Sequence, residues 1–193
     1  MSSREQILRA VKESKPAATE LPSIDLSAVI SFDDLSGQFR KTLESIGGSW
    51  EQAADQEEAA KIIAAELSNA KHTINTLGKY DEKLPLLTSE ELASADIAVI
   101  RGTIAVAENG AVWVSEYEIV NRILPFIAQQ LIIVVDEENI VPTMHHAFQQ
   151  IKINETGFGV FIAGPSKTAD IEQSLVIGAH GPAGLKVVII KGK

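Results

Sequence analysis

The sequence predicts an α/β domain built on a mostly parallel sheet with helices on both faces, preceded by a short helical appendage at the N-terminus. Two observations predict this fold class. From about residue 55 onwards, segments with helical spacing of apolar residues alternate with short runs rich in Val, Ile and Ala, and such alternation is typical of βαβ units. One of these runs, Leu131–Val135, is continuously apolar and branched, as expected for a strand covered on both faces.

The first 31 residues are expected to lie outside the domain. Residues 3–14 space their apolar side chains as one face of a short amphipathic helix. The segment 15–31 carries two prolines and little periodicity, so we expect no helix or strand longer than a few residues there. We therefore divide the chain into an N-terminal helix and linker, residues 1–31, and an α/β domain, residues 32–193.

Local patterns then predict the elements of the domain in order. Apolar residues at helical spacing over 35–46 predict a helix that Gly47 and Gly48 would end. Asp55 and Glu58 resemble the start of a capping box and predict a helix over 55–69. The other predicted elements are a strand at 72–77, a helical turn at 89–93, strands at 96–100, 111–114 and 131–135, a helix at 138–151, a strand at 158–163, a helix at 168–177 and a strand at 186–190.

The composition excludes several classes of function. The 193 residues carry a formal net charge of −9 with no run of Lys and Arg, which argues against binding to nucleic acid or to an anionic membrane surface. The sequence has no cysteine, so it offers no disulfide, no thiolate nucleophile and no thiolate ligand for an iron–sulfur cluster. We see neither a signal peptide nor an apolar run near the roughly 20 residues of a membrane span, and we expect a cytoplasmic protein without membrane insertion.

Ligands of parallel sheets bind beyond the carboxyl ends of the strands, so we expect the functional surface on loops in the C-terminal half. One candidate is the segment 164–172, GPSKTADIE, directly after a predicted strand. A turn followed by a helix start would aim free N–H groups at that edge, and Lys167 would add a positive charge. This predicts a site for an anion or a carboxylate. The alternative is a well-capped helix, with Ser166 or Thr168 as N-cap and Asp170 in its first turn.

A second candidate is Glu108, a single carboxylate among small and apolar neighbours in the stretch 102–110. Partial burial would raise its pKa and suit it to acid–base or nucleophilic chemistry. The alternative is a turn, because Asn109-Gly110 between two apolar runs is a strong hairpin signal. The local sequence favours the turn.

The histidines offer a third set of candidates. Ser166 and His180 flank a predicted helix roughly 15 Å long, too far apart for a nucleophile–base pair, so a serine hydrolase is not expected. We place His180 at the opposite edge of the sheet from Ser166. His145 and His146 are adjacent in a predicted helix and point about 100° apart, which predicts surface or packing histidines and no metal site.

These segments together resemble the LUD domain (lactate-utilisation domain) family. The pairing of GPSKTADIE with GAHGP is highly specific, and the resemblance covers about residues 95–190. The family usually has Glu-Thr-Gly where this chain has Glu108-Asn109-Gly110. The matching stretches are Ala95-Asp96, Gly102 to Ala105, Glu108 to Gly110, Leu124-Pro125 before LIIVV, residues 164–172 and residues 178–182.

The resemblance implies a fold like that of sugar-phosphate isomerases and class I coenzyme A transferases. It also implies work beside iron–sulfur partner proteins in oxidising L-lactate to pyruvate, with the clusters on the partners and no cofactor bound by this chain. Class I coenzyme A transferases carry a nucleophilic glutamate in Ser-Glu-Asn-Gly, which Ala107 to Gly110 matches without the serine. The candidate residues are Glu108 for catalysis, and Asn109, Gly110, Gly164, Pro165, Ser166, Lys167, Thr168 and Asp170 for binding a small carboxylate or other anionic ligand.

Three functions therefore stay open. The first, which the family likeness favours, is an accessory or ligand-binding protein of L-lactate utilisation whose partners supply the redox centres. The second is an acyl or coenzyme A transferase that uses Glu108. The third is a non-catalytic scaffold. The sequence leaves open whether any catalytic step takes place on this chain.

Overall fold

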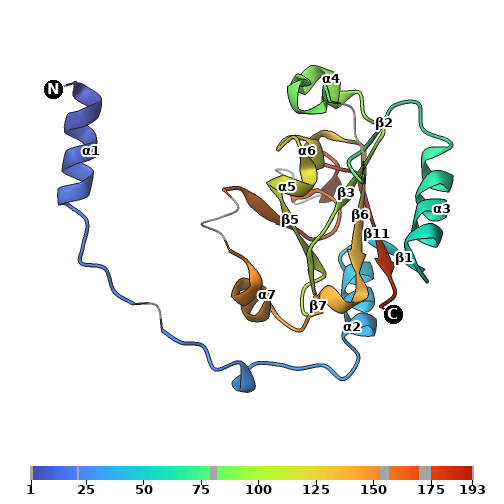
Figure 1. Ribbon diagram of the computed structural model, residues 1–193, viewed down its shortest axis with the longest axis horizontal. Helices are drawn as coiled ribbons and strands as arrows, with labels where there is room; N and C mark the ends of the chain where they lie inside the picture. Colours follow the sequence, from blue (N-terminus) through green and yellow to red (C-terminus); the bar gives the residue numbers. More distant parts are fainter. Residues whose placement is uncertain (1, 21, 79–81, 153–156, 170–174, 193) are drawn as a thin grey trace.

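The computed structural model describes residues 2–20, 22–78, 82–152, 157–169 and 175–192. Helix α1 (Ser3–Glu13) lies apart from the rest of the chain, at the end of an extended segment (Figure 1). None of its residues is buried. The described part of the linker contains one short element, the 3-10 helix η1 (Leu26–Ala28). The predicted N-terminal helix and the lack of long elements in the linker are both confirmed.

A five-stranded sheet forms the centre of the domain. Its strands run in the order β1-β11-β6-β3-β2, and every neighbouring pair is parallel. Residues 131–135 in the middle strand are all buried, so the prediction of a parallel sheet with a doubly covered strand is confirmed. The strands are β1 (Ser49–Ala53), β2 (Thr73–Asn75), β3 (Ile97–Arg101), β6 (Gln130–Asp136) and β11 (Gly184–Ile190).

Helix α3 (Gln56–Leu67) covers one face of this sheet (Figure 1). The Asp55 side chain accepts a hydrogen bond from the Glu58 backbone N–H at 2.9 Å and so caps the helix start, as predicted. Ala59 and Ile63 pack against the apolar side chains of β3, β6 and β11 that point to this face. The helix carries the chain from the β1 edge of the sheet to the β2 edge.

The other face of the sheet packs against helix α2 (Leu35–Ser45) and a second, smaller sheet. Phe39 and Leu43 of α2 are wholly buried in the shared core. The chain passes from β3 into the second sheet at Gly102, where a Cβ would lie 2.3 Å from Val112 Cγ1. The second sheet has the order β7-β4-β5-β8 and consists of β4 (Ile104–Val106), β5 (Ala111–Ser115), β7 (Ile140–Val141) and β8 (Gly159–Ile162).

Helix α7 (Met144–Gln150) packs on the outer face of the second sheet. There the Trp113 and Phe161 rings have centroids 4.8 Å apart. The helix predicted at 138–151 is therefore too long. Its first part instead forms the 3-10 helix η3 (Glu137–Asn139) and β7, because β7 pairs with β4.

The helix predicted at 168–177 is wrong. The described residues form the antiparallel pair β9 (Lys167–Ala169) and β10 (Leu175–Ile177), and residues 170–174 lie outside the described ranges. Thr168, Val176 and Ile177 are β-branched, and such residues favour extended backbone.

The remaining short elements lie between strands, with η2 and α4 between β2 and β3, and α5 and α6 between β5 and β6. The helical turn predicted at 89–93 is confirmed. Within the described ranges, no helix combines the length and apolar character needed to cross a bilayer. The elements are η2 (Leu84–Leu86), α4 (Ser89–Ala93), α5 (Glu116–Ile119) and α6 (Leu124–Ile127).

Candidate functional site

The Glu108–Gly110 segment is the turn of the hairpin between β4 and β5, as the local sequence favours. Gly110 has a φ of +69°, a left-handed conformation that favours glycine. A Cβ there would also lie 3.1 Å from the Leu43 backbone. The Asn109 side-chain oxygen accepts a hydrogen bond from the Ala111 N–H at 3.0 Å.

The Glu108 side chain caps α7. Its Oε1 accepts a hydrogen bond from the backbone N–H of Met144, the first residue of that helix, at 2.6 Å. The N-cap residue Thr143 makes no capping bond with its side chain, because its hydroxyl lies 2.9 Å from His146 Nδ1. A carboxylate at a helix N-terminus also interacts favourably with the helix dipole. This arrangement gives Glu108 a structural role.

The 164–168 segment binds to the C-terminal end of α2. Gly164 has a φ of +72°, and a Cβ there would lie 2.8 Å from the Ile46 carbonyl oxygen. The Lys167 ammonium donates a hydrogen bond to the same carbonyl. Since Ile46 is the C-cap residue of α2, Lys167 satisfies a carbonyl at the negative end of a helix.

This segment does not begin a helix, so the predicted set of free N–H groups is missing there. The Ser166 N–H donates to the Pro182 carbonyl at 2.9 Å, and the Ser166 carbonyl accepts from the Gly178 N–H at 3.0 Å. Thr168 is paired with Val176 in the β9–β10 ladder. Pro165 is buried, and Asp170 lies outside the described residues.

The two candidate loops approach the same place in the fold. Gly110 and Gly164 both come close to Ile46, and Gly110 also meets the last turns of α2. The 164–168 segment lies at a different edge of the sheet from the one that we expected. Ser166 bonds to Pro182, which precedes β11 by two residues, so the 164–168 segment lies at the amino edge of the parallel sheet.

The predicted separation of Ser166 and His180 is also wrong. No described helix lies between them, and a Cβ on Gly181 would be 3.1 Å from Ser166 Cβ. Even so, no hydrogen bond between described residues joins the His180 ring to the Ser166 hydroxyl, so the structure provides no nucleophile–base pair. His145 is exposed, and no group of three or more His, Asp and Glu in the described part of the chain could hold a metal ion.

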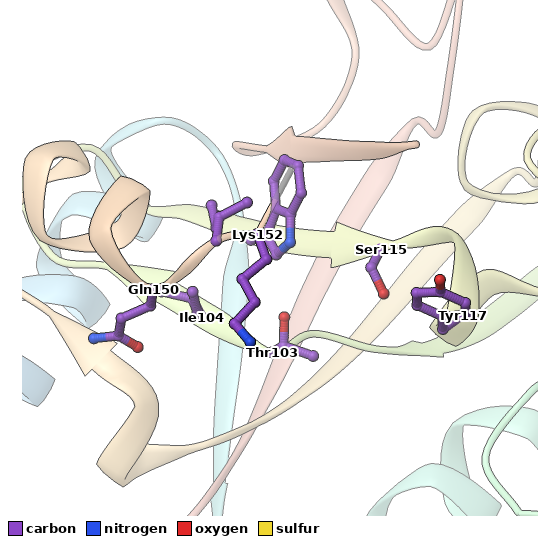
Figure 2. A pocket seen from close by; sticks show the side chains of 8 residues that line it. Thr103, Ile104, Ser115, Tyr117, Gln150 and Lys152 are labelled. Carbon is purple, nitrogen blue, oxygen red and sulfur yellow. The ribbon is translucent and has the colours of Figure 1, made fainter. Parts of the chain in front are cut away.

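A pocket of about 420 Å³ lies on the outer face of the second sheet, beside the end of α7 (Figure 2). We call it the β4–β5 pocket. Thr103 follows β3 by two residues, Ser115 ends β5, and Lys152 follows α7. The pocket is therefore close to the carboxyl end of a parallel strand, the usual place for a ligand. It is lined by Thr103, Ile104, Trp113, Ser115, Tyr117, Gln150, Ile151 and Lys152.

Two charged side chains lie at the carboxyl ends of β3 and β6. Arg101, the last residue of β3, forms an ion pair with Asp136, the last residue of β6. Glu118 belongs to the same short helix as Tyr117. Burial raises the pKa of the Glu118 carboxyl, and the positive charge of Arg101 partly opposes that shift.

The comparisons with known proteins decide the family. The profile of the LUD domain matches residues 75–190, which include every candidate residue above. The chain belongs to the LUD domain family.

Proteins named lactate utilization protein C match this LUD chain over different lengths. The one from Oceanobacillus iheyensis is 29% identical over 102 residues, 50% of this chain and 44% of that protein. The one from Exiguobacterium is 30% identical over 127 residues, 63% of this chain and 55% of the relative. The chain thus spans about half the length of these two relatives. The one from Deinococcus radiodurans is 28% identical over 199 residues, 95% of this chain and 92% of the relative.

A solved structure supports the fold. The crystal structure of a DUF162 family protein from Deinococcus radiodurans superposes with a TM-score of 0.63. The match covers 81% of this chain and 96% of that one, at 21% sequence identity. The LUD chain therefore shares its fold with that protein.

Sequence reasoning missed the β4–β5 pocket of this LUD domain. Among the described residues, its lining comes from three separate stretches of the chain, at 103–104, 113–117 and 150–152. The one local signal is Thr103, a polar residue directly after Gly102, the glycine near the end of the predicted strand. Nothing in the local sequence indicates that Lys152 would come to lie beside it.

Proposed function

We propose that this chain is an accessory, ligand-binding protein of L-lactate utilisation, and that iron–sulfur partner proteins carry out the oxidation of L-lactate to pyruvate. The observation that carries the proposal is the similarity to lactate utilization protein C of Deinococcus radiodurans, which extends over 95% of this chain and 92% of the relative. The chain has no cysteine, so it has no thiolates with which to hold an iron–sulfur cluster.

The positions of the candidate residues support an accessory role over the transferase alternative. A nucleophilic glutamate must reach an acyl group bound beside it, whereas the Glu108 carboxylate is hydrogen-bonded to the start of α7. Lys167 is likewise bonded to the end of α2. Both side chains connect elements of the fold, and these structural roles support a protein without covalent chemistry of its own.

Growth on defined carbon sources tests the proposal. We expect a host strain that lacks the gene to grow normally on pyruvate and to fail on L-lactate, and the intact gene on a plasmid to restore growth. Pyruvate is the matched control because it enters metabolism after the proposed step. Normal growth of the deletion strain on L-lactate, with no second copy of the gene, would contradict the proposal.

A further inference from the structure

We propose that two copies of this chain exchange α1, so that the apolar face of α1 in one copy packs on an apolar and acidic surface of the second copy, which returns the same contact. We call the receiving surface the η2–α6 surface. It consists of the exposed side chains of Leu86, Ile123 and Phe126 and the exposed carboxylates of Glu90 and Glu91 on α4. This assembly is independent of the proposed role in lactate utilisation.

Helix α1 has the local features of a stable helix, yet none of its residues is buried. The Ser2 hydroxyl accepts a hydrogen bond from the Glu5 N–H at 3.3 Å, and the Glu5 carboxylate accepts one from the Ser2 N–H at 2.8 Å, which completes a capping box. Ile7, Leu8 and Val11 share one face, and each is more than half exposed. Because so short a helix is marginal in water on its own, packing of this face would supply the stabilisation that it lacks.

The charge of α1 is opposite to that of the rest of the chain. Residues 1–15 include four basic and two acidic side chains, so their net charge is +2, and the remaining residues carry −11 of the total of −9. Arg4 and Lys12 lie four residues before and after Leu8, which places both at the apolar face of the helix. This face is therefore complementary to an apolar surface that also carries carboxylates.

The η2–α6 surface provides the apolar part of the contact. Leu86 is 81% exposed, and Ile123 and Phe126 are each more than 40% exposed. The two segments that carry these residues lie at the same end of the domain, where α4 packs against α6 (Figure 1). The Asn121 side-chain nitrogen also donates a hydrogen bond to the Leu87 carbonyl at 3.4 Å. Exposed apolar side chains gathered in this way are typical of an interaction surface.

The same surface is acidic. Among the described residues from 82 to 94, three are acidic and one is basic. Glu90 and Glu91 are both exposed on α4. Arg122, a basic residue on the second segment, forms an ion pair with Glu116 at 2.5 Å, which offsets its positive charge. The carboxylates on α4 therefore favour the basic side chains that flank the apolar face of α1.

The linker favours a second copy over the domain of the same chain. It enters the domain at the start of α2, at the end of the domain opposite α4 and α6 (Figure 1). It also holds α1 apart from that domain (Figure 1). An extended linker brings the helix within reach of a neighbouring copy, and exchange of an identical element between copies is a low-cost route to a twofold dimer.

The size of the contact requires the exchange to be reciprocal. One face of the 11-residue α1, about 16 Å long and about 10 Å wide, buries roughly 300–400 Å² on each partner. A single contact, or a pair of α1 helices, would therefore bury roughly 600–800 Å² in total, which is the size of a crystal-packing contact. Two contacts related by a twofold axis bury roughly 1,200–1,600 Å², which reaches the range of specific interfaces.

Sedimentation equilibrium of the full-length chain tests the exchange. We expect a monomer–dimer equilibrium with a Kd on the order of 10–100 µM, as suits a small interface with few large apolar side chains. Raising NaCl from about 50 mM to about 500 mM should increase this Kd several-fold, because salt screens the attraction between exposed charges. At the low micromolar concentrations of melting experiments most copies are separate, so the exchange adds little to the melting temperature of the domain.

Substitutions on both sides of the contact assign the dimer to the exchange. Leu8→Asp on α1 should raise the Kd at least tenfold, and Gln6→Asp, which adds the same charge on the opposite face of the helix, should leave it unchanged. Leu86→Asp should also raise the Kd at least tenfold, whereas Asn69→Asp, at an exposed position just after α3, should not. Circular dichroism melts of the four variants check that the domain remains folded.

Other occupants of the apolar face of α1 would give different results, and each of these overturns the proposal. A chain that stays monomeric at about 500 µM, several times the expected Kd, does not exchange α1. A dimer that Leu8→Asp disrupts and Leu86→Asp leaves intact would mean that two α1 helices pair with each other. A dimer that Leu8→Asp leaves intact would have its interface elsewhere. Flotation with vesicles of phosphatidylserine and phosphatidylcholine that is lost in Leu8→Asp would mean that α1 binds a membrane surface.

Discussion

At the scale of single residues, Glu108 belongs to a motif that resembles a catalytic one, yet its side chain stabilises the fold. Its carboxylate accepts the Met144 N–H at 2.6 Å, and its own backbone N–H donates to the Pro142 carbonyl at 3.1 Å. Both contacts connect the β4–β5 hairpin to the segment that begins α7. A helix leaves its first N–H groups without intrahelical partners, and here the missing cap comes from a residue 36 positions away.

Glu108→Ala should therefore lower the free energy of unfolding by about 1 kcal/mol, the usual cost of losing a helix cap. Glu108→Gln keeps an acceptor oxygen and should cost less than half as much. Urea unfolding at fixed pH measures both variants. Equal losses in the two variants would mean that the hydrogen bond to α7 is not the source of the effect.

The same residue also tests the transferase alternative. A nucleophilic Glu108 would attack acyl-coenzyme A to give a mixed anhydride and free coenzyme A thiolate. The thiolate would then attack the glutamyl carbonyl, which releases the acyl group as a free carboxylate and leaves a glutamyl thioester that hydroxylamine or borohydride traps. Because the Glu108 carboxylate is hydrogen-bonded to the start of α7, we expect no trapped adduct in the wild-type chain. A trapped adduct at Glu108 that disappears in Glu108→Gln would establish the enzyme instead.

At the scale of elements, strong local patterns predicted the structure well, and pairing between distant segments did not follow from them. The buried run of β6, the cap of α3 and the turn α4 each follow from residues close together in sequence. β1 has the sequence SWEQA, which carries little apolar pattern, and it exists as a strand because it pairs with β11. The β9–β10 pair likewise depends on a partner strand, whereas the acidic residues between the two strands suggested a helix.

The candidate loops show the same division. The Asn109-Gly110 turn was predictable because its signal is local, and the structure confirms it. The contact of Gly164 and Lys167 with Ile46 joins segments more than 100 residues apart. No local pattern encodes that contact, so the sequence placed the loop at the wrong edge of the sheet.

Gly164 provides a test at this scale. Gly164→Ala must adopt a φ of +72° and also bring its Cβ to 2.8 Å from the Ile46 carbonyl oxygen. Gly78 has a similar φ of +78°, and a Cβ there would meet no atom of the described residues within 4 Å, so Gly78→Ala isolates the backbone cost of about 1 kcal/mol. We expect Gly164→Ala to lose about 2–3 kcal/mol by urea unfolding, because strain and close packing add. Equal losses in the two variants would show that the loop is not held against α2.

At the scale of the whole molecule, the β4–β5 pocket illustrates why a site can be invisible in sequence. It forms where the chain leaves β3, where β5 ends and where α7 ends. These places become neighbours only after the second sheet has formed and α7 has packed on it. Each of these places contributes one or two polar residues, and these residues line a common pocket only after the chain has folded.

The whole-molecule arrangement also predicts how independent the N-terminal helix is. Ile7, Leu8 and Val11 on α1 are 52% to 62% exposed, and no residue of the helix is buried. An isolated helix shorter than about 12 residues is marginal in water, so α1 should contribute almost nothing to the stability of the domain.

Removing residues 1–14 should therefore leave cooperative thermal unfolding intact, with a melting temperature within about 2 °C of the full chain, since a change of 1 kcal/mol moves the melting temperature of a protein of this size by about 2–4 °C. Phe39→Ala is the matched positive control. That side chain is wholly buried, and its loss should cost about 3–5 kcal/mol and lower the melting temperature by at least about 6 °C. A truncated chain that melts as low as Phe39→Ala, or without cooperativity, would show that the apolar face of α1 packs against the domain in solution.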